Sequence, residues 1–185
     1  MSHRIADALL VLPLILLATG AHARDWQVDA AKSSLAFKCS YAGEGFDGKF
    51  GKFTAQIAYD ETDLASAKFD VNVNLASADT QNSDRDEALA GADFFDSAKS
   101  PPAHFVTQAF GKAADGSVEA KGTLTIRGQT KPVTLKVHFA ASGNGATLDV
   151  DTTLKRLDFG LGTSSDWNDI GKDVPVHGHL VLTAK

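Results

Sequence analysis

The feature that most constrains this chain is a strict alternation of apolar and polar residues. Between residues 67 and 75 every odd position is apolar, as at Phe69 and Val71, and every even position is polar. Successive side chains of a β-strand point to opposite faces, so this period predicts a strand with one buried and one solvated face. The same pattern recurs at residues 35–41, 53–59, 118–126, 133–139, 148–154 and 174–183, and less regularly at 104–110. The sequence therefore predicts eight strands.

Turn-forming residues separate most of these strands. Asp115-Gly116 and Arg127-Gly128 are short turn signals, and Gly43, Gly45 and Gly48 predict a loop between the first two strands. Strands that follow one another through short turns pair antiparallel. An all-β meander of this size folds into either a sandwich or a barrel, and the alternation alone leaves both open.

One segment, at residues 82–92, predicts a helix. Asn82 or Ser83 can cap its start, and Asp84 and Asp86 complement the positive end of the helix dipole. The segment lies between the third and fourth predicted strands. We expect this helical insertion to cover one open end of the barrel.

The first 23 residues resemble a cleavable signal peptide. Residues 9–17 form an unbroken apolar run, and Ala21 and Ala23 are the small residues that a signal peptidase reads. The run is too short to span a bilayer, which takes about 20 residues. We therefore expect removal of residues 1–23, export to a periplasm, and one mature domain at residues 24–185. A net charge of −5 disfavours binding to nucleic acid, which depends on basic contacts to phosphate.

The sequence contains no nucleotide-binding or hydrolase motif, and no spacing that predicts a general acid and base. Cys39 falls on the inner face of its strand, where burial makes a thiol inert. His177 and His179 point the same way and could chelate a metal, but they fall on the solvated face without a carboxylate nearby in sequence. His104 and His138 are isolated, and we interpret both as structural. We therefore predict no catalysis, no metal and no cofactor.

The apolar inner faces leave two alternatives open. An eight-stranded barrel is small enough to be filled by its own side chains, and wide enough to hold one slender ligand. Ala55, Ala120 and Gly122 are small residues at inward positions that leave room for such a ligand. The pattern does not choose between a filled core and a cavity.

Several segments resemble the YceI-like family of exported, polyisoprenoid-binding proteins. They are Trp-Gln-Val-Asp at residues 26–29, Gly-Thr-Leu-Thr-Ile-Arg-Gly-Gln-Thr-Lys-Pro-Val at residues 122–133, and Arg-Leu-Asp-Phe-Gly-Leu at residues 156–161. Residues 85–105 resemble the helical insertion of the family. Two positions depart from the family pattern, because Lys32 and Cys39 stand where relatives often carry histidine.

The resemblance implies an eight-stranded antiparallel lipocalin-like β-barrel that holds a polyisoprenoid or another long-chain amphiphile, with a quinone-like lipid as one option. Such a protein is a carrier or storage protein without catalytic activity. Some relatives occur beside cytochromes of the b561 type. The alternative is thus a metal-dependent or redox accessory protein that works with such a membrane partner. Pairing into a homodimer is left open.

On this interpretation, the lipid tail contacts apolar residues on the inner faces of the strands. They are Phe37, Phe53, Ile57, Phe69, Val71, Leu124, Ile126, Val133, Leu135 and Val137. Arg85 and Asp86 are expected at the mouth, where they would contact the head group, although dipole complementation also explains Asp86. Arg156 and Asp158 are comparable head-group candidates. The polar segment at residues 162–173 receives no predicted role.

Overall fold

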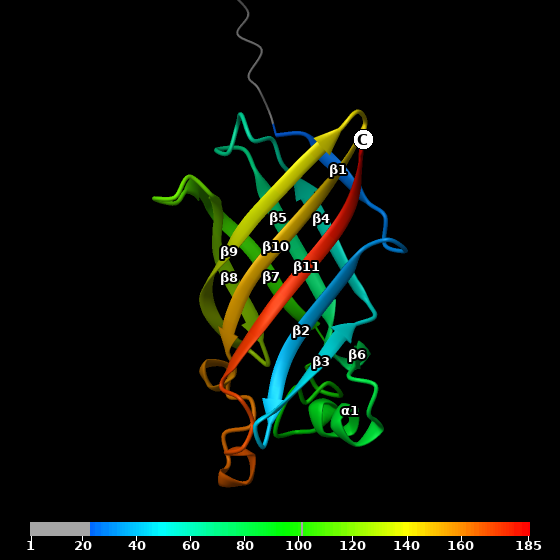
Figure 1. Cartoon of the computed structure of the whole chain (residues 1–185), viewed down its shortest axis with the longest axis vertical. Helices are drawn as coiled ribbons and strands as arrows, with labels where there is room; N and C mark the ends of the chain where they lie inside the picture. Colours follow the sequence, from blue (N-terminus) through cyan, green and yellow to red (C-terminus); the bar gives the residue numbers. More distant parts are fainter. Residues whose placement is uncertain (1–22, 101) are drawn as a thin grey trace, which may run out of the picture.

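The computed structural model describes residues 23–100 and 102–185, which form a closed antiparallel β-barrel with one short helix at one end (Figure 1). The predicted signal peptide lies outside the described residues except for Ala23. The strands are β1 (Asp25–Val28), β2 (Ser34–Tyr41), β3 (Glu44–Phe50), β4 (Phe53–Ala58), β5 (Lys68–Asn74), β6 (Ala78–Asp79), β7 (Pro102–Lys112), β8 (Val118–Ile126), β9 (Gln129–Ser142), β10 (Gly145–Lys155) and β11 (Asp173–Ala184).

The barrel has eight strand positions because two of its strands are interrupted. β4, β5, β7, β8, β9, β10 and β11 are neighbours in that order, and β1 closes the ring by pairing with both β11 and β4. β1 and β2 pair with successive parts of β11, while β4 and β3 pair with β1 and β2. β1 and β2 therefore act together as one interrupted strand of the barrel. β3 and β4 act together as the next one. The predicted eight-stranded antiparallel barrel is confirmed, and the sandwich is excluded.

The prediction of a glycine-rich loop between the first two strands is wrong. Gly45 and Gly48 lie inside β3, and only Gly43, with a φ of +84°, occupies the turn that follows β2. A Cβ atom on Gly48 would lie 2.2 Å from Cζ of Phe37. Glycine is therefore needed here so that an aromatic ring can lie directly on the strand, and it does not break the strand.

The helical insertion is confirmed as α1 (Ser83–Ala90), between β5 and β7. The Asn82 side chain accepts a hydrogen bond from the backbone N–H of Arg85 at 3.0 Å, which caps the first turn. Figure 1 shows α1 at the same end of the barrel as the segment that connects β10 to β11. No helix within residues 23–100 and 102–185 is long and apolar enough to cross a membrane.

Aromatic rings fill the half of the barrel that carries β1 and the C-terminus. We call this cluster the aromatic plug; it consists of Trp26, Tyr59, Phe69, Phe110 and Phe139. The Tyr59 ring lies 4.9 Å from Phe139, 5.7 Å from Phe69 and 5.8 Å from Phe110, measured between ring centroids. Trp26 packs edge-on against Phe139 at 5.3 Å. This half of the barrel is a solid core.

The Tyr59 hydroxyl is a buried polar group within the aromatic plug. The side chain is fully buried, and its Oη atom finds no hydrogen-bond partner in the described part of the chain. Burial raises the pKa of Tyr59 to about 12. An unsatisfied buried polar group costs roughly 1–3 kcal/mol. We therefore expect Tyr59→Phe to increase the free energy of unfolding by about 1 kcal/mol, as measured by urea denaturation.

Tyr41→Phe is the matched control, because the Tyr41 side chain is 53% exposed and can bind water. It should leave the free energy of unfolding unchanged. A loss of stability in Tyr59→Phe would show that its hydroxyl is satisfied.

Candidate functional site

The other half of the barrel, next to α1, is hollow. It encloses a cavity of about 460 Å³ lined by apolar side chains of β2, β3, β5, β7, β8, β9, β10 and β11. Ala88 and Leu89 of α1 and Phe94 and Phe95 just after it cover its end. No residue of the aromatic plug lines this cavity. The sequence left open whether the barrel has a filled core or a cavity. The structure has a filled core in one half and a cavity in the other.

The structure separates the predicted wall residues into two groups. The cavity is lined by Phe37, Val71, Leu124, Ile126, Val133 and Leu135. The other four lie elsewhere, in the core around the aromatic plug: Phe53, Ile57, Phe69 and Val137. Alternation predicts which face a residue is on, but it does not tell how far along the barrel axis the residue lies.

The small inward residues do not create the cavity. Ala120 is fully buried in the core around the plug, and Ala55 packs against that core. A Cβ atom on Gly122 would lie 2.3 Å from the Val106 carbonyl oxygen and 2.8 Å from the Phe105 ring. The space that these residues leave is therefore occupied by neighbouring protein atoms, and our expectation about them is wrong.

Sequence reasoning missed the residues that form the end of the cavity. Phe159, Leu161, Trp167 and Ile170 line it from the segment between β10 and β11, of which only residues 162–173 receive no role from the sequence. The Trp167 ring packs edge-on against Phe94 at 5.0 Å. Two sequence signals pointed to this region: the motif at residues 156–161, which contains Phe159 and Leu161, and the apolar residues Trp167 and Ile170 within the polar segment.

Arg156 holds this segment in place. Its side chain is buried, and its guanidinium group donates five hydrogen bonds to backbone carbonyl oxygens. The acceptors, at 2.5–3.0 Å, belong to Leu161, Gly162, Trp167, Ile170 and Gly171. No acidic side chain in the described residues forms an ion pair with it, and burial lowers the pKa of Arg156. All five donors are used within the protein, so Arg156 acts as a clamp and has none left to donate to a head group.

The remaining head-group candidates lie in different environments. Arg85 reaches the cavity lining, where its guanidinium lies over the Phe46 ring at 4.4 Å and donates to Thr80. Asp86 is absent from the lining and accepts hydrogen bonds from the Thr80 backbone N–H and hydroxyl. Asp158 is exposed and is not among the residues that line the cavity.

Cys39 lines the cavity from β2. Burial raises the pKa of the Cys39 thiol, as predicted from its inward position. The thiolate, which is the reactive form, is therefore scarce at neutral pH.

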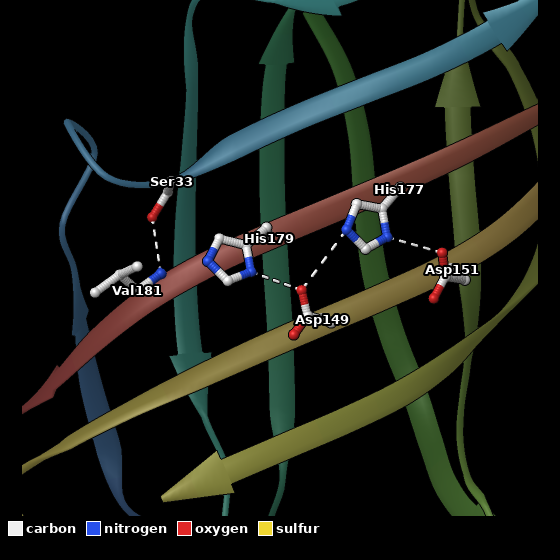
Figure 2. A network of polar contacts seen from close by, with 6 residues as sticks. All are labelled: Ser33, Asp149, Asp151, His177, His179 and Val181. Carbon is white, nitrogen blue, oxygen red and sulfur yellow. Dashed lines mark hydrogen bonds and ion pairs between the residues drawn. The ribbon is translucent and has the colours of Figure 1, made fainter. Parts of the chain in front are cut away.

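His177 and His179 lie on the outer face of β11, as predicted, but carboxylates face them across the sheet (Figure 2). Nδ1 of His177 lies 2.8 Å from Asp151, and Nδ1 of His179 lies 2.6 Å from Asp149. No carboxylate is near these histidines in sequence, but the β10–β11 register brings residues about 30 positions apart side by side.

These contacts do not form a metal centre. Across the two described ranges, no group of three or more His, Cys, Asp or Glu is arranged to hold a metal ion. His104 and His138, which we interpret as structural, also have acidic neighbours. His104 contacts Asp70 at 2.9 Å, and His138 lies opposite Asp149 in the β9–β10 register.

The family model described as the YceI-like domain matches residues 26–182 of this chain. These limits coincide with Trp26 of β1 and Leu182 of β11, which lie in the strands that close the barrel. The chain belongs to the YceI-like family.

Its relatives include a UPF0312 protein of Vibrio cholerae, which is 30% identical over 89% of this chain and 92% of the relative. Among solved structures, this YceI-like chain is similar to BcnA of Burkholderia cenocepacia. The match has a TM-score of 0.79 and 31% identity, and covers 84% of this chain and 99% of BcnA. A polyisoprenoid binding domain from Saccharophagus degradans shares the fold with a TM-score of 0.68 and 18% identity, over 88% of this chain and 99% of that domain.

In this YceI-like barrel, Gly48 determines the position of one cavity wall residue. Because a Cβ atom at position 48 would overlap the Phe37 ring, Gly48→Ala must displace that ring or bend β3. Overpacking of this kind costs about 1–3 kcal/mol, and we expect the free energy of unfolding to fall by that amount in chemical denaturation.

Gly45→Ala is the matched control on the same strand, since the nearest atom to its added Cβ is 4.0 Å away. We expect Gly45→Ala to change the free energy of unfolding by no more than about 0.5 kcal/mol, as is typical of an exposed site. Equal destabilisation by the two substitutions would show that the contact with Phe37 is not the cause.

Proposed function

We propose that this YceI-like protein binds an isoprenoid or another long-chain lipid inside its barrel, and that it serves as a non-catalytic carrier or storage protein in the periplasm. The observation that carries the proposal is the cavity of about 460 Å³ with an almost wholly apolar lining. Apolar cavities of roughly 300–1,000 Å³ are typical of small-molecule sites. The shared fold with a polyisoprenoid binding domain supports the choice of ligand class.

The size of the cavity indicates how much of a lipid it can hold. At about 30 Å³ per heavy atom, the volume per molecule of liquid water, 460 Å³ accommodates roughly 15 heavy atoms, or about three isoprene units. Burial of about 15 methylene-sized groups at roughly 0.8 kcal/mol each contributes about 12 kcal/mol. This is comparable to the roughly 4–15 kcal/mol lost when two molecules associate. A tail of this length therefore offsets all but the upper end of this range of association costs.

Organic extraction of the freshly purified protein, followed by mass spectrometry, tests the proposal. We expect a long-chain isoprenoid or similar amphiphile in the extract. Protein that carries no lipid, and that binds neither farnesol nor a fatty alcohol after purification, would contradict the proposal. The cytochrome b561-type partner and the homodimer stay predictions from the resemblance.

Cys39 provides a second readout, because its thiol lines the cavity. We expect a bound lipid to shield the thiol from a maleimide, so addition of farnesol to delipidated protein should slow alkylation about tenfold or more. The rate is measured by mass spectrometry of the intact protein under native conditions. An alkylation rate that does not respond to farnesol would place the lipid outside this cavity.

A further inference from the structure

The lining of the cavity reaches solvent between the β2–β3 turn and α1. Of the described residues that line the cavity, all but two are buried or half-buried. The two exposed residues are Tyr41, at the end of β2, and Asp84, in the first turn of α1. Figure 1 shows the β2–β3 turn at the same end of the barrel as α1. The exposed margin of the cavity therefore lies between these two elements.

Arg85 is held in a fixed position at this margin. Its guanidinium group lies over the Phe46 ring, 4.4 Å from the ring centroid, and both residues line the cavity. Its Nε and Nη2 atoms donate hydrogen bonds to the hydroxyl and carbonyl oxygens of the buried Thr80, at 3.2 and 3.1 Å. The Thr80 hydroxyl in turn donates to the Asp86 carboxylate at 2.7 Å. These contacts orient the guanidinium group before any ligand arrives.

Three of the five N–H groups of Arg85 are not used by the protein. Arginine carries five donors, and the contacts with Thr80 occupy two of them. Arg85 forms no ion pair with any residue in the described ranges. In contrast, Arg156, which also lines the cavity, donates all five N–H groups to backbone carbonyls. Of these two arginines, Arg85 is therefore the one that can donate to a ligand.

The charges around Arg85 disfavour a further negative charge at this margin. Asp84 precedes it in the chain, and Glu44 lies two positions before Phe46, on the same face of β3. Asp86 adds a third carboxylate one residue after Arg85. One guanidinium among three carboxylates leaves this region negative. A carbonyl or hydroxyl oxygen can accept a hydrogen bond from Arg85 without adding charge, whereas a phosphate adds negative charge.

We infer that the cavity opens between Tyr41 and Asp84, and that Arg85 donates hydrogen bonds there to the oxygen of an uncharged lipid head group while the tail lies inside. The inference rests on the proposed function. The ligand class is then a neutral long-chain amphiphile whose head group carries a carbonyl or hydroxyl oxygen.

Three probes that share three isoprene units test the head-group contact. Farnesene has no oxygen, farnesol has a hydroxyl group, and farnesyl phosphate is anionic. Their binding can be followed through the fluorescence of Trp167, which lines the cavity. We expect the unaltered protein to bind farnesol about tenfold more tightly than farnesene, the effect of one hydrogen bond from a charged donor. Farnesyl phosphate should bind no more tightly than farnesol.

Arg85→Met removes the donors and keeps an unbranched side chain. It should lower the affinity for farnesol about tenfold, to that for farnesene, without changing farnesene binding. Lys49→Met is the matched control, because Lys49 is exposed, pairs with Asp79 at 3.4 Å and does not line the cavity. It should keep the preference for farnesol.

A preference for farnesol that persists in Arg85→Met would overturn the inference, as would tighter binding of farnesyl phosphate than of farnesol. An equal loss of farnesene and farnesol binding in Arg85→Met would show that Arg85 only holds α1 in place, and would also overturn it. Failure of all three probes to bind the unaltered protein would instead overturn the proposed function.

A bulky label tests the position of the opening. Asp84→Cys in a Cys39→Ala background can be coupled to a polyethylene glycol maleimide, and we expect the label to slow farnesol uptake about tenfold or more. Asn144→Cys in the same background is the control, because Asn144 is exposed in the β9–β10 turn, beside the C-terminus at the other end of the barrel (Figure 1). Its label should not alter uptake. Equal uptake rates before and after labelling at position 84 would place the opening elsewhere and overturn the inference.

Discussion

Replacement of Leu124 by tryptophan should abolish lipid retention while the barrel remains folded. Leu124 lines the cavity from β8, so a larger side chain extends into empty space. Tryptophan adds six heavy atoms, which at about 30 Å³ each remove roughly 180 Å³ of the 460 Å³ available. The loss of about six buried methylene-sized groups at roughly 0.8 kcal/mol each weakens binding by about a thousandfold or more.

Mass spectrometry of the extracted lipid and titration with farnesol measure this effect, and thermal unfolding reports on the fold. Thr123→Trp is the matched control, because Thr123 precedes Leu124 on β8 and points to the opposite face. It should retain the lipid. If Leu124→Trp still carries as much lipid as the unaltered protein, the lipid binds outside this cavity.

Substitution of Arg156 by lysine should strongly destabilise the protein. Lysine keeps the positive charge but replaces the planar group with five donors by a single ammonium group, which cannot reach five carbonyl oxygens. Buried acceptors then lose their partners, and disruption of a buried charged network typically costs about 3–5 kcal/mol. We expect a fall of that size in the free energy of unfolding, measured by urea denaturation.

The same substitution should release the segment that closes the cavity, since the acceptors include Leu161, Trp167 and Ile170, which line it. Limited proteolysis within residues 160–172 should therefore become faster, and lipid retention should decrease. Lys155→Ala is the control next to it. This residue forms an exposed ion pair with Asp173, and its loss should cost less than about 1 kcal/mol. A similarly small effect in Arg156→Lys would show that the packing of Trp167 on Phe94 is enough to hold the segment.

The strand content and the barrel could be predicted because alternation is a local property of the sequence. The extent of the cavity could not be predicted from this alternation. Phe69 and Val71 share a face of β5, yet Phe69 belongs to the aromatic plug and Val71 lines the cavity. Whether a residue belongs to the aromatic plug or lines the cavity depends on its position along the barrel axis. That position follows from the register and tilt of the strands across the whole sheet.

The clamp and the histidine–aspartate contacts were missed for related reasons. The acceptors of Arg156 are backbone carbonyl groups, which every residue possesses, so no side-chain pattern marks them. Asp149 and Asp151 are remote from His177 and His179 in sequence, and only the β10–β11 register brings them together. The motif at residues 156–161 did indicate an important position, but it did not reveal its structural role.

The aromatic plug stabilises the barrel independently of what occupies the cavity. Because Trp26, Tyr59 and Phe69 pack together at the end away from the cavity, their contacts do not depend on whether a lipid is bound. The form with an empty cavity can therefore stay folded. For the same reason, residues around the cavity can change to suit a different lipid while the stability of the fold is maintained from the other end.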